Sequence, residues 1–277
     1  MHPQPVQAPL AQEMNVSMGP RLYVDGKRLG VGGQPFALDE GASRHVQVLR
    51  LQPGDGIRLF NGRGQEWAAS VVEMGRKVVQ VRLGEPVEND RELPVHVTLA
   101  VGMPANDRMD AVVEKATELG VRTVQPLVCA RSVLRLDGER AAKKVAHWQA
   151  VAVSASEQCG RAVVPQILPV QSLANWLKQD QATPVATHRG VLSLREAVAV
   201  HGWLAGRSGV AGTDSGSGSG AVSDWCFLNG PEGGLAPEEE SLALAQGWTA
   251  VSLGKRVLRA DTAPLAVLSV MAAVFEV

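Results

Sequence analysis

The chain contains few cysteines and no long apolar run. Its three cysteines, Cys129, Cys159 and Cys226, are odd in number and far apart, which excludes a disulfide framework and the ligand spacing of a zinc site. The six histidines also fall in no metal-binding pattern, so we expect no bound metal. No apolar run approaches the roughly 18 residues of a membrane-spanning helix, so we expect no membrane partner.

The first 18 residues lack the features of a secretory signal. Their sequence has no basic start followed by an apolar core. We expect residues 1–18 to be a disordered N-terminal extension; the alternative is that translation begins at Met14 or Met18. The expected location of the protein is the cytoplasm.

The net charge of −1 conceals an uneven distribution of charge. Residues 20–83 contain ten basic and six acidic side chains, whereas the rest of the chain is acidic. Such asymmetry favours a module that faces nucleic acid, although a solvated surface explains it equally well. A hydrophobic content of 45% and a length of 277 residues allow one large or two ordinary globular domains.

Residues 19–90 are predicted to form a small β-rich domain. We expect one helix at 40–51 and strands at 21–25, 57–60, 67–72 and 78–83, with a hairpin turn at Asn61-Gly62. This content suggests a small barrel. Residues 85–94, rich in charge and proline, are predicted to be the linker.

Residues 93–277 alternate between predicted strands and helices, which is typical of an α/β domain with a mostly parallel sheet. We expect strands at 95–101, 124–128, 185–187, 225–228 and 250–253. The expected helices are 107–119, 138–158, 173–178, 194–204, 237–247 and a last one from about 263. Residues 206–223, dense in glycine and serine, are predicted to be a flexible loop.

A glycine-rich loop directly after the strand at 225–228 is the most informative motif. Glycines at the carboxyl end of a strand let backbone groups approach a ligand closely. The loop matches neither a Walker loop nor a dinucleotide fingerprint. The alternative is a tight strand-to-helix turn capped by Pro237 and Glu238. The loop contains Leu228, Asn229, Gly230, Pro231, Glu232, Gly233 and Gly234.

A second glycine loop, residues 253–263, follows the next strand and carries Lys255, Arg256 and Arg259. Arginines beside a ligand loop can bind phosphate or stabilise charge that develops on a base carbonyl. A solvated basic turn is the alternative. His188 comes after the strand expected at 185–187 and is a candidate for the same pocket. The helix at 107–119 is interpreted as an ordinary packing helix.

Several segments resemble the RsmE family of 16S rRNA (uracil-N3)-methyltransferases, which belong to the SPOUT class. The resemblance runs from about Pro20 to the C-terminus. Its most specific segments are Arg131-Ser132-Val133, residues 157–161, Gly230-Pro231-Glu232-Gly233-Gly234 and residues 253–262.

The resemblance implies an N-terminal PUA-like β-barrel that binds rRNA and a SPOUT α/β domain with a deep trefoil knot. It also implies S-adenosylmethionine as the cofactor and a homodimer that methylates a uridine of the small ribosomal subunit. The cofactor-binding residues would be His188, Leu228, Asn229, Gly230, Pro231, Glu232, Gly233, Gly234, Leu253, Gly254, Val257 and Leu258.

The uracil nitrogen becomes nucleophilic once it loses its proton, and an arginine can stabilise the resulting anion. We nominate Arg259 first and Arg256 second for this catalytic role. Arg21, Arg44, Arg50 and Arg63 are nominated as rRNA contacts. Methylation of another RNA site, and a non-catalytic RNA-binding protein with this fold, stay open as alternatives.

The chain departs from the family pattern at three places. Ala105-Asn106 replaces a frequent cation-glycine pair, which puts a cationic role there in doubt. Asp261 stands where a glutamate is usual and is one methylene shorter, so its reach differs. The segment 206–223 looks like an insertion that the family pattern lacks.

Overall fold

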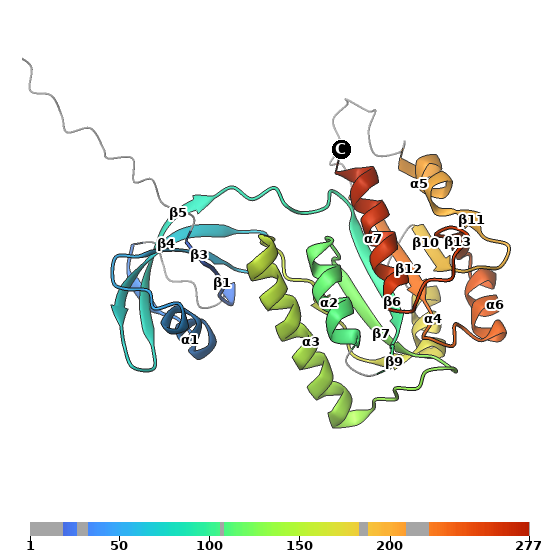
Figure 1. Ribbon diagram of the computed structural model, residues 1–277, viewed down its shortest axis with the longest axis horizontal. Coiled ribbons are helices and arrows are strands. Elements are labelled where there is room, and N and C mark those ends of the chain that lie inside the picture. Colours follow the sequence, from blue (N-terminus) through green and yellow to red (C-terminus); the bar gives the residue numbers. More distant parts are fainter. Residues whose placement is uncertain (1–18, 27–32, 106–107, 183–187, 209–221, 277) are drawn as a thin grey trace, which may run out of the picture. The chain divides into compact units, whose positions relative to one another are not determined.

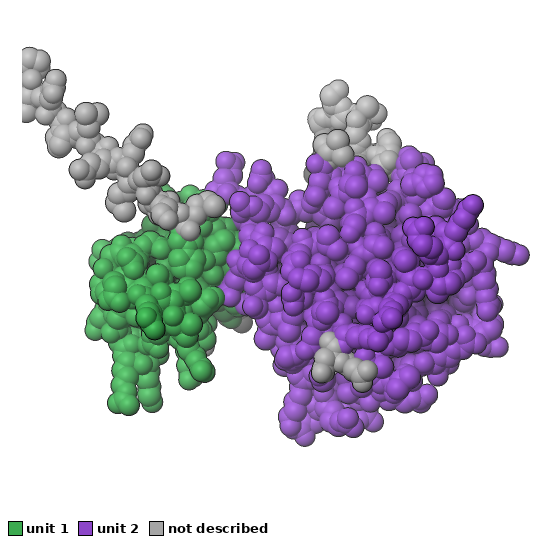
Figure 2. Space-filling view, viewed as in Figure 1, with its two compact units in different colours: residues 1–60, 66–87 green, residues 61–65, 88–277 purple. Residues whose placement is uncertain are grey.

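The computed structural model describes residues 19–26, 33–105, 108–182, 188–208 and 222–276. The expected disordered extension at 1–18 lies outside the described residues, as does most of the expected Gly/Ser loop. The chain divides into two compact units, which Figure 2 colours separately. Unit 1 comprises residues 1–60 and 66–87, and unit 2 comprises residues 61–65 and 88–277.

Unit 1 is built on a five-stranded sheet with the strand order β1-β3-β4-β5-β2. Its elements are β1 (Arg21–Tyr23), β2 (Pro35–Ala37), α1 (Glu40–Val48), β3 (Gly56–Phe60), β4 (Glu66–Met74) and β5 (Val79–Val87). Asp39 begins the helix, because its side chain accepts a hydrogen bond from the Ala42 N–H at 2.8 Å. Alternate strand residues and the helix bury one apolar core, which includes Leu22, Ile57 and Val81.

The strand β5 extends further than the sequence suggested. Residues 85–94 were expected to be a linker, but Pro86 and Val87 pair with Trp67 and Glu66 of β4. Proline removes a donor from the ladder, yet it is tolerated near the end of a strand. The expected start of the linker at 85 is therefore wrong.

Arg21 lies in the interior of unit 1 rather than on an open surface. Its guanidinium donates two hydrogen bonds to Glu66, at 3.0 and 2.9 Å, and its charged end lies 4.6 Å from the centre of the Phe60 ring. The Glu66 side chain is fully buried and that of Arg21 is 11% exposed. Because a buried carboxylate is costly without its counter-ion, this pairing gives Arg21 a structural role, and its contact with rRNA stays a prediction.

Unit 2 contains an eight-stranded sheet in which all described pairings are parallel. The strand order is β11-β13-β10-β12-β6-β7-β8, with β9 also paired to β7. The strands are β6 (His96–Gly102), β7 (Thr123–Val128), β8 (Gln166–Ile167), β9 (Gln171–Ser172), β10 (His188–Leu192), β11 (Val198–Ala199), β12 (Asp224–Asn229) and β13 (Thr249–Ser252).

Helices cover both faces of this sheet, as Figure 1 shows. On β12, Trp225 and Phe227 belong to one apolar cluster, whereas Cys226 and Leu228 belong to another. The first cluster includes residues of α2 (Arg108–Glu118), α3 (Gly138–Cys159), α5 (Val200–Ser208) and α7 (Thr262–Phe275). The second includes residues of α4 (Leu173–Ala182) and α6 (Pro237–Ala245). No helix within the described residues is long and apolar enough to cross a membrane.

One expected element of unit 2 was misplaced, and another falls outside the described residues. A strand was expected at 185–187, which lies outside the described residues, whereas β10 occupies the next five positions. A helix was expected at 194–204, but Val198 and Ala199 pair with β13 and α5 runs to Ser208. The pairing with β13 overrides the local helical spacing, so the expected loop cannot begin at 206.

A buried arginine closes the C-terminal end of α2. The Arg161 side chain donates to the carbonyl oxygens of Thr117 and Val121, at 2.7 and 2.9 Å. It also donates twice to Glu92, whose second oxygen accepts the Val163 N–H at 3.0 Å. One guanidinium therefore satisfies a carbonyl of the last helical turn, a carbonyl just beyond the helix and a carboxylate at once.

Replacing Arg161 by methionine should destabilise unit 2, because Glu92 and two carbonyls would lose their donor. We expect the free energy of unfolding to fall by about 3 kcal/mol in urea denaturation followed by tryptophan fluorescence. The control is Lys143→Met, which removes an exposed ion pair with Glu139 and should stay within about 0.5 kcal/mol of the wild type. Equal stability of the two variants would contradict this role of Arg161.

Candidate functional site

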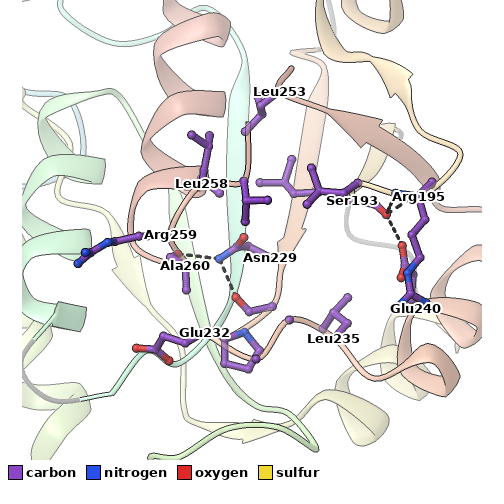
Figure 3. A pocket seen from close by; sticks show the side chains of 18 of the residues that line it. Ser193, Arg195, Asn229, Glu232, Leu235, Glu240, Leu253, Leu258, Arg259 and Ala260 are labelled. Atoms are coloured by element: carbon purple, nitrogen blue, oxygen red, sulfur yellow. Dashed lines mark hydrogen bonds between the residues drawn. The ribbon is translucent and has the colours of Figure 1, made fainter. Parts of the chain in front are cut away.

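A cavity of about 680 Å³ lies at the carboxyl ends of β10, β12 and β13. Loops that follow these three strands form most of its wall (Figure 3). Leucine side chains and glycine backbone line it together with charged groups. The lining residues include Leu192, Ser193, Leu194, Arg195, Asn229, Gly230, Pro231, Glu232, Gly233, Gly234, Leu235, Leu253, Gly254, Arg256, Val257, Leu258, Arg259 and Ala260.

The loop after β12 is packed so tightly that it requires glycine. A Cβ at Gly230 would lie 2.6 Å from the Leu235 nitrogen, and one at Gly102 would lie 2.7 Å from Pro231. Gly234 adopts a φ of +68°, which is unfavourable for other residues. The sequence predicted this loop at the sheet edge, and the structure places it in the cavity wall.

Asn229 joins the first glycine loop to the second. Its side chain is 5% exposed, and its amide nitrogen donates to the carbonyl oxygens of Gly230 at 3.0 Å and Ala260 at 2.8 Å (Figure 3). Asn229 and Ala260 are 31 residues apart in sequence. The sequence marked Asn229 as a ligand residue, whereas this geometry makes it the bridge between the loops.

The loop after β13 contributes both apolar and cationic groups to the cavity. Leu258 is half-buried, whereas Val257 is 80% exposed. Gly254 adopts a φ of +118°. The exposed side chain of Arg259 extends away from Asn229 and Leu258 in Figure 3. Arg259 therefore lies at the rim of the cavity with its side chain exposed.

A third loop, residues 192–195, completes this wall and was missed by sequence reasoning. The Ser193 hydroxyl donates to the Glu240 carboxylate of α6 and accepts the Arg195 N–H at 3.0 Å. These contacts hold the loop against α6. The signal that could have located the loop was the apolar pair Val191-Leu192, which ends the strand.

His188 was expected to line this pocket, and the structure places it elsewhere. It begins β10, so it lies at the amino end of the strand, whereas the cavity lies at the carboxyl end. Its ring lies 4.1 Å from that of Trp225. Burial and the nearby Arg207 lower the pKa of His188.

A group of three charged side chains occupies the rim near the start of α2. Glu232 accepts the Ala105 N–H at 2.9 Å and lies 3.6 Å from the Arg108 guanidinium. The Nε atom of Arg108 lies 4.0 Å from the Asp261 carboxylate. The loop after β12, the helix α2 and the segment before α7 thus meet at the Arg108 guanidinium. The sequence assigned only packing to the helix that carries Arg108.

Cations outnumber anions in the cavity wall. Five arginines line it, at positions 108, 131, 195, 256 and 259, against the carboxylates of Glu232 and Glu240. Arg131 is engaged with the carbonyl oxygens of Gly233 and Leu235, at 2.9 and 3.3 Å. The described residues contain no cluster of three or more His, Cys, Asp or Glu suited to a metal. The wall therefore suits an organic ligand beside an anionic partner.

Comparisons with known proteins agree with this architecture. A family model described as an RNA methyltransferase domain matches residues 91–272, and an RNA methyltransferase PUA domain matches residues 38–84. Ribosomal RNA small subunit methyltransferase E of Bacillus subtilis is 31% identical over 81% of this chain and 84% of its own length. The protein of that name from Mycobacterium tuberculosis is 32% identical, over 81% and 80% respectively.

Solved structures show the same fold with a ligand bound. The small subunit methyltransferase E of Neisseria gonorrhoeae, bound to S-adenosyl methionine, is 34% identical and covers 93% of this chain and 98% of its own. Its TM-score is 0.79. A Legionella pneumophila protein in complex with the cofactor SAM is 32% identical over 92% of this chain and 98% of its own, with a TM-score of 0.78. The chain belongs to the ribosomal RNA small subunit methyltransferase E family.

Proposed function

We propose that this protein uses S-adenosylmethionine to methylate the N3 atom of a uridine in 16S rRNA of the small ribosomal subunit. The observation that carries the proposal is the cavity formed by the two glycine loops, joined by Asn229, in a chain of this family. When bound, S-adenosylmethionine supplies a methyl group on a positively charged sulfur.

The cavity suits this cofactor in size and in chemistry. Its volume of about 680 Å³ lies within the range of about 300–1,000 Å³ that small-molecule sites occupy. Leucines at 192, 235, 253 and 258 can cover an adenine ring, whereas exposed backbone at Gly233 and Gly234 can bind polar atoms. Residues 228–234, Leu253, Gly254, Val257 and Leu258 remain the proposed cofactor site. Leu192–Arg195 replaces His188 in it.

Arg259 is the proposed catalytic cation, and Arg256 is the second candidate. Both are exposed in the cavity wall, and the described residues offer Arg259 no ion-pair partner. A guanidinium that donates to a uracil carbonyl oxygen stabilises the charge released when N3 loses its proton. The free charge of Arg259 suits this role better than that of Arg108, which two carboxylates neutralise in part.

The proposed rRNA surface of unit 1 is the end of α1 together with the β4–β5 turn. Arg44 and Arg50 are exposed on or beside the helix, and Arg76 and Lys77 are exposed in the turn. Gln47 brings the two segments together, because its amide donates to the carbonyl oxygens at 75 and 76. The exposed Arg63 remains a further candidate. Clustered cations of this kind bind phosphates without reading sequence.

Finer features of the architecture are also part of the proposal. Unit 1 would close into a PUA-like barrel, and unit 2 would contain the deep trefoil knot of SPOUT enzymes. A cytoplasmic homodimer is expected, and Val133 and Val257, which are 77% and 80% exposed, are candidates for its interface. A monomer mass by light scattering would contradict the dimer.

The function is tested with purified protein, small ribosomal subunits and S-adenosylmethionine. Nucleoside mass spectrometry should detect N3-methyluridine in 16S rRNA. Gly230→Ala should weaken cofactor binding in calorimetry by roughly a hundredfold, because the added Cβ displaces the loop. Gly202→Ala is the matched control, because nothing lies within 4 Å of its Cβ. Product without methylated N3, or no cofactor binding by the wild type, would contradict the proposal.

Replacing Arg259 by alanine should abolish most methyl transfer while leaving cofactor affinity unchanged. We expect the single-turnover rate to fall by about 10²–10³-fold, the usual cost of removing one donor to a developing oxyanion. Arg256→Ala should cost less. Lys255→Ala, a neutralised cation in the same loop, serves as the control. A rate equal to that of the wild type in Arg259→Ala would refute this assignment.

The double variant Arg44→Gln/Arg50→Gln should bind small subunits more weakly and with less dependence on salt. Removing two phosphate contacts should reduce the slope of log affinity against log salt by about 1.5. Filter binding at several salt concentrations measures the slope. Arg140→Gln, at an exposed position of α3, should leave it unchanged. An unaltered slope in the double variant would exclude this surface.

A further inference from the structure

Asp261 occupies a capping position without acting as a cap. It is the residue before α7, yet its side chain makes no hydrogen bond to the backbone of the first helical turn. Asp39, at the corresponding position of α1, caps its helix through the Ala42 N–H. The Asp261 carboxylate therefore does not make the capping hydrogen bond that usually explains an aspartate at the start of a helix.

The groups that face Asp261 hold its carboxylate loosely. One oxygen lies 4.0 Å from the Arg108 Nε atom of α2, and the other lies 3.5 Å from the Thr262 hydroxyl. Glu232, from the loop after β12, lies on the other side of Arg108. The side chain of Asp261 is 28% exposed. A carboxylate in this state is oriented but keeps an accessible lone pair for a further donor.

Asp261 lies at the rim of the cavity, just outside its wall. The preceding residues Arg259 and Ala260 line the cavity, and so does Ala263 of α7. Arg108 lines it as well. If the cofactor fills the cavity, the target base must meet the methyl group from the rim. Asp261 and Arg259 would then approach the same base from one loop.

Other groups near the cavity are less suited to accept a proton. Glu240 already accepts the Ser193 hydroxyl, and Glu232 accepts the Ala105 N–H. Burial raises the pKa of Cys129 to about 12, so this thiol remains protonated at neutral pH. His188 lies at the opposite end of β10 from the cavity.

We propose that the Asp261 carboxylate accepts the N3 proton of the target uridine, and that Arg108 is the positioning residue that orients it. This inference rests on the proposed function. The N3–H bond breaks and its proton passes to Asp261, while the nitrogen electron pair forms the N3–CH3 bond. The electron pair of the S–CH3 bond returns to sulfur, which becomes a neutral thioether. Protonated Asp261 then releases its proton to water.

The proton transfer needs no strongly basic group. The N3 proton becomes more acidic when a cation donates to an adjacent carbonyl oxygen, because the negative charge left on N3 spreads onto that oxygen. Arg259 is the cation proposed for this donation. A carboxylate within hydrogen-bond reach can therefore accept the proton during methyl transfer.

The test compares Asp261→Asn, Asp261→Glu and the wild type in single-turnover methylation of small subunits. Loss of the carboxylate should lower the rate by about 10²–10³-fold with unchanged cofactor affinity. Asp261→Glu keeps a carboxylate and should retain the rate within about tenfold. Asp137→Asn is the matched control, because Asp137 is an exposed N-cap of α3 that also makes no capping hydrogen bond.

A second measurement separates proton acceptance from a structural role. The rate of Asp261→Asn should rise with pH, because hydroxide removes the N3 proton that the variant cannot accept. Subunits whose rRNA contains 5-fluorouridine, with a more acidic N3–H, should restore part of its rate. A merely structural Asp261 would lower thermal stability and would give neither rescue. Arg108→Ala should lower the rate less than Asp261→Asn does.

The outcomes are distinguishable from failure of the proposed function. If the wild type makes no N3-methyluridine, the function itself is wrong. If the wild type is active and Asp261→Asn matches it, Asp261 is not the proton acceptor. A slow Asp261→Asn variant without rescue by pH or 5-fluorouridine also overturns the proposal. A slow variant with both rescues supports it.

Discussion

The side-chain amide of Asn229 donates to one carbonyl of each glycine loop, and the rest of the site depends on this contact. Arg108 adds a looser link between the same loops, because it lies 3.6 Å from Glu232 and 4.0 Å from Asp261. The Asn229 amide is buried, so water cannot replace either hydrogen bond. Because Ala260 lies between Arg259 and Asp261, the hydrogen bond to its carbonyl holds the backbone from which both charged side chains extend.

The parallel sheet explains why loops distant in sequence can meet at all. The central strand β12 is buried on both faces, and its successive residues belong to two different apolar clusters. Because the strands are parallel, their carboxyl ends share one edge, where glycine backbone and the side chains of leucine and arginine meet. The packed strands hold the ends of the loops in fixed positions, and the loops carry the groups that contact a ligand. Tight packing of Gly230 and Gly102 shows how little freedom the loop after β12 retains.

Sequence patterns predicted most elements of the fold and both glycine loops, because apolar periodicity and glycine spacing are local properties. They failed where tertiary contacts decide. Val198 and Ala199 form a strand only because β13 offers them partners, and that error displaced α5. His188 was expected at the cavity, whereas it begins β10 and lies at the amino end of that strand. Ser193 and Glu240 could not be found, since their pairing joins segments 47 residues apart.

The surroundings of an arginine side chain are the clearest example of a property that a sequence cannot resolve. Arg21, Arg161 and Arg259 are equivalent in a count of charge, yet the first two are largely buried and paired with Glu66 and Glu92. A guanidinium that donates to such a carboxylate has fewer donors left for a ligand, and removing it would leave the carboxylate without its counter-ion. Arg259 is exposed beside the cavity, so its field acts on whatever approaches. Whether an arginine can serve catalysis or stabilises the fold therefore depends on whether it has an acidic partner. The number of arginines in the chain does not decide it.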